Sequence, residues 1–443
     1  MPINIKWDST YKCNLHCEHC INGALLDDNS NDISCLEFER IIDDIQNNIK
    51  INSIHLLGGE PTVRKDFLEV CKVLENRKIF FGFNTNSLLL TDDLIRNLLS
   101  LKYLRNIVIS LEGANATTND EIRGKKVFDV LVKRLVELSK MKEKVKSPVS
   151  ITINTVLTNQ NFNQIEQLVD LALLLRVDQL NFLQIIEEGN AKGKELGLSD
   201  NQFLSAIETI ANVYPKVKNQ LRITPRFARP LAKEYAMTVL SKDFPEVRQG
   251  CSAGINFAFM DNRGRLFPCN RLLGDKSVEK DNFSLAKNPF TFVWAQEQFD
   301  IPLKIMESDR YANLEPCKYC HYFKKSCFPC PAQIDEFDQI HECMLLNRCI
   351  NNIKFNDIKL KDRFLYRVVR KNNDSFLFVN TGSGKHLLLN EEAAKFFQFL
   401  KDKESLQYSD IENYAIHNKA NLSECNRFLN YLREQNYFSG TSH

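Results

Sequence analysis

Two hydrophobic periodicities alternate along the first 220 residues of the sequence. Short runs rich in β-branched and aromatic residues are separated by longer segments in which apolar residues recur with helical spacing. A repeated strand, helix, strand order predicts a parallel sheet, which either curls into a barrel or stays open and doubly wound. Ligands bind at the carboxyl ends of the strands in both folds. The expected strands are 3–7, 53–57, 78–84, 106–111, 149–157 and 179–185, and the expected helices are 34–50, 65–77, 91–101, 127–144 and 161–176.

Three cysteines follow the first expected strand, at the predicted ligand-binding edge. They are Cys13, Cys17 and Cys20, in the stretch CNLHCEHC. Three thiolates are one fewer than a closed zinc or cubane iron–sulfur site takes, so the fourth position is left to another group. The alternative is a structural zinc site that His16 or His19 completes.

The composition favours metal ligation over disulfide bonds. Fourteen cysteines in 443 residues are too sparse for a disulfide scaffold. The chain starts without a cationic segment followed by an apolar run, and it has no stretch of about 18 apolar residues. We therefore expect a cytoplasmic protein with no membrane partner. The formal net charge of +2 gives no basic surplus for binding phosphate backbones, so nucleic acid is not expected as a partner.

Eight further cysteines lie between residues 251 and 349. Their spacing suits metal or cluster sites, and one or two zinc sites of four cysteines each are the alternative to iron–sulfur clusters. Cys35, Cys71 and Cys425 stand alone in helical patterns, and we interpret them as small buried hydrophobic residues. The eight cysteines are Cys251, Cys269, Cys317, Cys320, Cys327, Cys330, Cys343 and Cys349.

The composition changes after Cys349. Residues 350–362, INNIKFNDIKLKD, are polar and without cysteine, which predicts a linker. Three short strands are expected next, in FLYRVVR, SFLFVN and KHLLLN. Helical patterns follow, and Asn390 stands where it can cap the first of them. The expected helices are 391–401, 408–418 and 422–436.

The pair of motifs CNLHCEHC and HLLGGEPT resembles the radical S-adenosylmethionine (SAM) enzymes. In the second motif, two glycines let the backbone approach a ligand, and Glu60 offers a carboxylate to an ammonium group. The resemblance implies an α/β fold, a partial (β/α)6 TIM-like barrel, over residues 1–220. It implies that Cys13, Cys17 and Cys20 hold a [4Fe-4S] cluster whose open iron binds SAM, and that SAM cleavage gives a 5′-deoxyadenosyl radical. The SAM-binding residues that it implies are Gly58, Gly59, Glu60, Ser110, Arg123 and Asn154.

The second cysteine group resembles the SPASM extension of peptide-modifying radical SAM enzymes, although its spacing departs from that pattern by one residue in two places. The resemblance implies two auxiliary [4Fe-4S] clusters within residues 221–355. One would be held by Cys251, Cys269 and Cys330, and the other by Cys317, Cys320 and Cys327 with Cys343 or Cys349. Sulfatase-maturing relatives use an aspartate as a base where this chain has Asn270. An amide cannot accept that proton, so formylglycine formation is disfavoured.

Residues 356–443 resemble the PqqD-like peptide recognition element, a small winged-helix α+β fold that can take up a leader peptide as an added strand. Together the resemblances imply a radical SAM enzyme that modifies a ribosomally made precursor peptide by forming a thioether or carbon–carbon bond. An electron donor such as flavodoxin or ferredoxin is implied as a second partner. The alternatives are a maturase of a folded protein or of a peptide-derived redox cofactor, and, outside enzymes, a zinc-dependent regulator with a DNA-binding winged helix.

Overall fold

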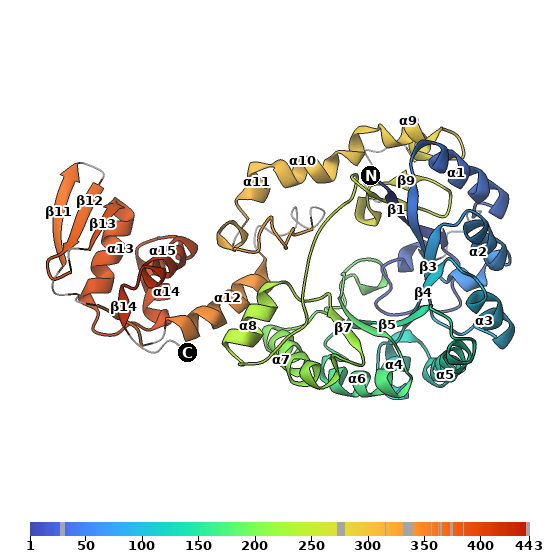
Figure 1. The fold of residues 1–443 in the computed structure, drawn as a ribbon, viewed down its shortest axis with the longest axis horizontal. Helices are drawn as coiled ribbons and strands as arrows, with labels where there is room; N and C mark the ends of the chain where they lie inside the picture. The colour runs from blue at the N-terminus through green and yellow to red at the C-terminus, as the bar shows by residue number, and fades with distance from the viewer. Residues whose placement is uncertain are drawn as a thin grey trace.

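The structure, a computed structural model, consists of a larger body that contains the N-terminal half of the chain and a smaller C-terminal unit (Figure 1). No helix in the described ranges is both long and apolar enough to cross a membrane. The residues that the structure describes are 1–26, 32–272, 280–314, 316–330, 340–355, 357–361, 363, 366–372, 375–383 and 385–439.

A sheet with strand order β7-β6-β5-β4-β3-β2-β1-β8-β9 forms the larger body. Neighbouring strands from β1 to β7 are parallel, and β8 also pairs in parallel with β1. All six strands expected from the sequence are confirmed, and the predicted parallel α/β sheet with them. The strands are β1 (Ile3–Thr10), β2 (Ile51–Gly58), β3 (Phe80–Thr85), β4 (Leu104–Ser110), β5 (Ser150–Leu157), β6 (Gln179–Gln184), β7 (Arg222–Pro225), β8 (Phe257–Met260) and β9 (Leu266–Phe267).

Helices cover the outer face of this curved sheet (Figure 1). Ser34 begins the first of them with a capping box, in which its hydroxyl accepts from Glu37 N while the Glu37 carboxylate accepts from Ser34 N. The five helices expected from the sequence are confirmed, and three more follow the same alternation. The helices are α1 (Cys35–Asn48), α2 (Phe67–Asn76), α3 (Asp92–Leu99), α4 (Ala116–Arg123), α5 (Val127–Val145), α6 (Ile165–Leu174), α7 (Asp200–Val217) and α8 (Leu231–Thr238).

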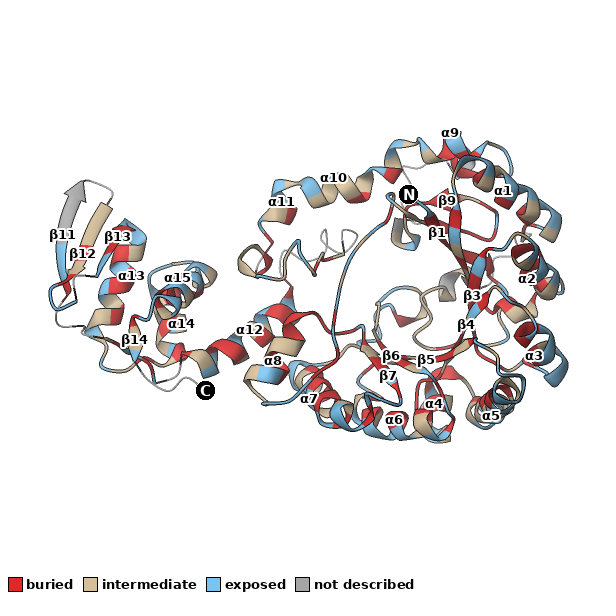
Figure 2. Ribbon diagram, viewed as in Figure 1, coloured by how far each residue is buried: buried red, intermediate tan, exposed pale blue. Residues whose placement is uncertain are grey.

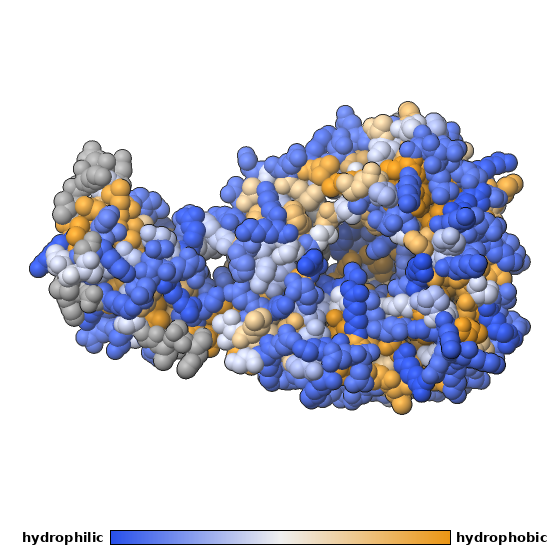
Figure 3. All heavy atoms as spheres, viewed as in Figure 1, coloured by the Kyte–Doolittle hydropathy of each residue, from blue (hydrophilic) through white to orange (hydrophobic). Residues whose placement is uncertain are grey.

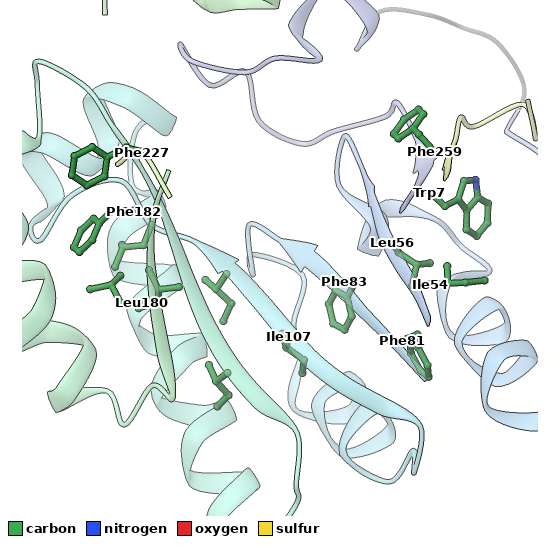
Figure 4. Packing of buried hydrophobic residues seen from close by; sticks show 14 of the residues in the cluster. Trp7, Ile54, Leu56, Phe81, Phe83, Ile107, Leu180, Phe182, Phe227 and Phe259 are labelled. Carbon is green, nitrogen blue, oxygen red and sulfur yellow. The ribbon is translucent and has the colours of Figure 1, made fainter. Parts of the chain in front are cut away.

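The two faces of the sheet differ in polarity because side chains alternate along each strand. Figure 2 shows buried residues along the strands and on the helices that cover them, and Figure 4 shows apolar side chains that point from the strands towards these helices. Trp7 of β1, for example, stacks on Phe38 of α1 with ring centroids 4.1 Å apart. The inner face carries polar residues such as Lys6 and Asp8, which line a cavity inside the barrel. The space-filling view shows the larger body hollowed at this point (Figure 3).

The sheet extends past residue 220, the predicted end of the barrel domain. Strand β7 adds to β6, and β8 adds to β1, so both edges of the sheet come from the segment expected to form the second domain. The rest of that segment contains short helices and ends in α12, which leads to the C-terminal unit (Figure 1). These helices are α9 (Phe290–Trp294), α10 (Ile301–Glu307), α11 (Asp309–Ala312) and α12 (His341–Lys354).

The C-terminal unit has its own hydrophobic core, separate from that of the larger body. The three predicted strands form an antiparallel sheet, the three predicted helices follow, and the Asn390 side chain caps the first helix by accepting from Ala393 N at 2.9 Å. A two-stranded sheet of β10 (Lys359–Leu360) and β14 (Phe438–Ser439) closes the unit. The three strands are β11 (Tyr366–Asn372), β12 (Ser375–Asn380) and β13 (His386–Asn390), and the three helices are α13 (Glu391–Asp402), α14 (Tyr408–His417) and α15 (Leu422–Glu434).

The prediction of a linker at residues 350–362 is wrong. Helix α12 continues to Lys354, and Phe355 and Leu360 are buried in the core of the C-terminal unit. The apolar residues of this stretch are few, but most of them pack against a core and Ile353 is the exposed one, so its polar composition did not indicate a solvated segment.

Candidate active site at the mouth of the barrel

The three N-terminal cysteines line one cavity of about 330 Å³ at the carboxyl ends of the strands. Cys17 is buried, whereas Cys13 and Cys20 are partly exposed. Burial, followed by the nearby thiols of Cys17 and Cys13, raises the pKa of Cys20 to about 11. The free thiols are therefore protonated at neutral pH, and a metal or cluster that binds them must displace their protons.

At Gly58 and Gly59, the backbone at the end of β2 lies very close to the end of β1 and to the cysteine loop. A Cβ atom on Gly58 would lie 2.1 Å from the carbonyl oxygen of Thr10, and one on Gly59 would lie 2.3 Å from that of Lys12. Gly58 also has φ +121°, a conformation that glycine adopts without strain. The two glycines were expected to let the backbone approach a ligand. In the structure, they let it approach the backbone of Thr10 and Lys12.

Glu60 is 1% exposed, and its carboxylate is already hydrogen-bonded. It accepts from the Thr62 hydroxyl at 2.5 Å, from the Thr85 hydroxyl at 2.8 Å and from Asn86 N at 2.6 Å. The carboxylate therefore joins the ends of β2 and β3 below the cavity. Its predicted contact with an ammonium group stays a prediction.

Ser110, Asn154 and Arg123 also line the cavity of the three cysteines. Ser110 and Asn154 are paired in register on β4 and β5, and Asn181 of β6 donates its amide to Asn154 Oδ1 at 2.8 Å. Arg123, at the end of α4, is 6% exposed, and its carbonyl oxygen lies 3.9 Å from the Cys17 sulfur. All six residues expected to bind SAM thus surround one cavity.

Glu112 is the central charged residue of the site that sequence reasoning missed. It is 2% exposed and accepts from the Arg123 guanidinium at 3.1 Å, while His19 Nε2 lies 3.3 Å from the same oxygen. Burial alone raises the pKa of Glu112, but His19 and Arg123 together hold it below its usual value. The signal was present, since Glu112 is the third residue of the SLEG stretch that contains Ser110. His19, considered as a zinc ligand, thus contacts a carboxylate.

Cys251, Cys269 and Cys330 form a second group beside the barrel. Burial raises the pKa of the Cys269 thiol, and so do the charges that Cys330 and Cys251 carry when ionised, which places the three close together. Cys251 and Cys330 line a cavity of about 630 Å³. The neighbouring Asn270 instead lines the cavity of the N-terminal cysteines, so the second group adjoins the first site.

The third group consists of four cysteines that line one cavity of about 430 Å³, between the larger body and the C-terminal unit. Cys349 is not among them, and its charged neighbours are Arg348 and Asp200. Because Cys343 and Cys349 lie six positions apart on α12, they occupy different faces of that helix. The four residues are Cys317, Cys320, Cys327 and Cys343.

The fit of these groups to iron–sulfur clusters rests on their shared cavities and on the chemistry of the donors. In the described ranges, no three Cys, His, Asp or Glu side chains stand in an arrangement that holds one metal ion. A cubane cluster binds each thiolate at a separate iron, so it requires sulfurs distributed around a cavity. The first and third groups supply thiols in that way, and in the second group Cys251 and Cys330 share a cavity. The isolated Cys71 and Cys425 are instead buried within apolar cores, as predicted, whereas Cys35, also predicted to be buried, is only partly buried at the start of α1.

Comparison with known proteins identifies relatives of the N-terminal part of the chain. The sequence model of the Radical SAM superfamily matches residues 7–172. The mycofactocin maturase MftC of Mycolicibacterium smegmatis is 34% identical over 171 residues, which are 39% of this chain and 42% of that protein. This match therefore spans less than half of the maturase. The AdoMet-dependent heme synthase of Methanosarcina barkeri is 24% identical over 75% of this chain and 92% of its own length.

A third relative is the PqqA peptide cyclase of Rhodopseudomonas palustris, 25% identical over 57% of this chain and 72% of that protein. Among solved structures, Streptococcus suis SuiB bound to precursor peptide SuiA has a TM-score of 0.54 at 21% identity, covering 68% of this chain and 66% of SuiB. The enzyme anSMEcpe, with bound AdoMet and the Cp18Cys peptide, has a TM-score of 0.57 at 16% identity, covering 80% of this chain and 97% of that protein. These similarities confirm the predicted fold of the barrel.

Proposed function

We propose that this chain is a radical SAM enzyme that modifies a ribosomally made precursor peptide. The observation that carries the proposal is one cavity, at the carboxyl ends of the strands, that gathers three cysteine thiols and all six expected SAM-binding residues. The three cysteines and the six expected SAM-binding residues all lie within the segment that matches the Radical SAM superfamily. Relatives named as a maturase and as a peptide cyclase support a peptide as the substrate.

The residues of the first cavity have separate tasks in this proposal. Cys13, Cys17 and Cys20 hold a [4Fe-4S] cluster, and SAM lies beside it. When bound, the cluster and SAM supply a radical that can take hydrogen from an unactivated C–H bond. Glu112 fixes the Arg123 guanidinium at the cavity wall through their ion pair.

The two other cysteine groups hold auxiliary [4Fe-4S] clusters in this proposal, which would supply acceptors for the electron released on product formation. We assign Cys251, Cys269 and Cys330 to the group beside the barrel. To Cys317, Cys320 and Cys327 we add Cys343 in place of Cys349, because only Cys343 shares their cavity. Among the described residues, Cys251 and Cys330 are the two cysteines that line their cavity, and neither Cys269 nor a fourth cysteine lines it.

The C-terminal unit is proposed to act as a PqqD-like element that binds the leader of the precursor peptide. Strand β11 lies at one edge of the three-stranded sheet, paired only with β12. A leader can add to such an edge as a further strand, with main-chain hydrogen bonds for affinity. A flavodoxin or ferredoxin is the proposed electron donor, and the cytoplasm is the proposed location.

A second candidate is oxidation of a small molecule, because the match to the AdoMet-dependent heme synthase covers 92% of that enzyme. The same match leaves a quarter of this chain uncovered. A separate C-terminal unit with an open sheet edge has no evident use for a small substrate, so we favour the peptide. Asn270 remains an argument against sulfatase-type maturation, since an amide cannot act as the base.

Iron and sulfide analysis of anaerobically reconstituted protein tests the cluster assignment. Three cubane clusters require about twelve iron atoms per chain. The Cys343→Ala variant should lose about four of them, because one thiolate of a four-cysteine site is gone. The matched control, Cys349→Ala on the same helix, should retain them all. Equal iron loss in both variants, or zinc in place of iron, would contradict the assignment.

A further inference from the structure

Four arginines line the cavity beside the second cysteine group. Arg222 and Arg226 come from β7 and the residue after it, Arg248 from the segment that leads to Cys251, and Arg229 from the turn before α8. This cavity, of about 630 Å³, has Cys251 and Cys330 in its wall. A concentration of cations next to a proposed redox site calls for a ligand of opposite charge.

Few carboxylates among the described residues balance the positive charge of this cavity. Among the described residues that line it, Glu246 is the one carboxylate, and Glu246 pairs with Lys233 at 2.7 Å. Arg229 is buried and donates to the Gln249 side chain. Within the described ranges, Arg222, Arg226 and Arg248 have no carboxylate at ion-pair distance, and all three are exposed to the solvent of the cavity.

The cation cluster reaches into the first cavity through Lys6. Lys6 stands on the inner face of β1 and lines the cavity of the N-terminal cysteines. Burial, and next the charge of Arg226, lowers the pKa of Lys6, while burial and the charge of Arg222 lower that of Arg226. Arg226 is therefore repelled by Arg222 within this cavity and by Lys6 of β1. The carboxylate near Lys6 is Asp8, whose pKa burial raises to about 7, so it is a weak counter-ion at neutral pH.

We propose that Arg222, Arg226 and Arg248 bind a carboxylate group of the peptide substrate. A guanidinium fork matches a carboxylate with two parallel hydrogen bonds, and an anion would relieve the repulsion among the cations. Cys251 and Cys330 are in the wall of this cavity, so a substrate segment held there lies beside the second cysteine group. The inference rests on the proposed function and adds that the segment being modified carries an acidic side chain or a free C-terminal carboxylate.

Equilibrium dialysis of the full reconstituted chain with three labelled tripeptides tests this site. The probes are acetyl-Gly-Glu-Gly-amide, acetyl-Gly-Gln-Gly-amide and acetyl-Gly-Gln-Gly with a free C-terminus. We expect one of the two anionic peptides to bind at least roughly tenfold tighter than the neutral one, the usual range for charge-assisted hydrogen bonds. Which anionic peptide is preferred distinguishes a side-chain carboxylate from a terminal one.

The variants show whether these arginines are responsible. The double variant R226Q/R248Q should lose the preference, R226K/R248K should keep most of it, and the control R40Q, an exposed arginine on α1, should leave it unchanged. Equal binding of charged and neutral peptides, or a preference that survives in R226Q/R248Q, would overturn the inference. SAM cleavage by the parent chain is measured separately. If the parent chain cleaves SAM but does not prefer an anionic peptide, only this inference is wrong. If the parent chain cannot cleave SAM, the proposed function is wrong.

Discussion

Replacing Cys13, Cys17 and Cys20 together with alanine is expected to abolish reductive cleavage of SAM and to lower the iron content by about four atoms per chain. The three thiols share one cavity, and no other cysteine of the described ranges lines it. The measurement is 5′-deoxyadenosine by liquid chromatography and mass spectrometry, after anaerobic incubation with SAM and dithionite.

The control for the triple variant is Cys35→Ala. Cys35 is a partly exposed cysteine at the start of α1, outside the three groups. This variant should keep both its iron and its SAM cleavage. Circular dichroism must show that the triple variant is folded, because loss of a metal can unfold the region that binds it. A folded triple variant that still forms 5′-deoxyadenosine would show that these cysteines do not hold the cluster that cleaves SAM.

Removing the C-terminal unit after Lys354 should lower the rate of peptide modification at limiting peptide by ~100-fold, the typical loss when one of two linked binding sites disappears. The cut separates the two hydrophobic cores, since Phe355 is the first residue of the C-terminal one. Mass spectrometry of the peptide measures the effect.

The truncation can also affect the third cysteine group. Residues of α15, including Asn426 and Tyr431, also line the cavity of Cys317, Cys320, Cys327 and Cys343, so the truncated chain can lose that cluster as well. A cycle with a leaderless peptide separates the two effects. If the C-terminal unit binds the leader, the full chain should modify a leaderless peptide as slowly as the truncated chain modifies the complete peptide. The truncated chain should then modify the leaderless peptide no more slowly than in either single case. If the two reductions in rate are instead additive in free energy, the leader binds somewhere other than the C-terminal unit.

The sequence predicted the strands and helices of the barrel because their periodicities are strong and their lengths ordinary. Strands β7 and β8 were missed because each has four residues, too few to show an alternation, and only pairing with β6 and β1 makes them strands. The predicted end of the barrel at residue 220 followed from that omission.

Site residues were predictable where a motif contains them and not where tertiary structure brings them together. Glu112 stands in the SLEG stretch beside Ser110, but its role is visible only once α4 and the cysteine loop supply Arg123 and His19 as its partners. Cys343 and Cys349 could not be separated without knowing that a helix carries both. Arg222, Arg226 and Arg229 lie within one short stretch of the sequence, but only the fold brings Arg248 and the second cysteine group beside them.

The central claim, that a radical made from SAM takes hydrogen from a peptide, is tested most directly by isotope transfer. The reconstituted chain is incubated anaerobically with SAM, reductant and a deuterated precursor peptide encoded beside its gene, and the 5′-deoxyadenosine formed is analysed by mass spectrometry. The account predicts deuterium in 5′-deoxyadenosine, together with a peptide that has lost hydrogen. Unlabelled 5′-deoxyadenosine with an unchanged peptide, obtained with every candidate precursor, would contradict it.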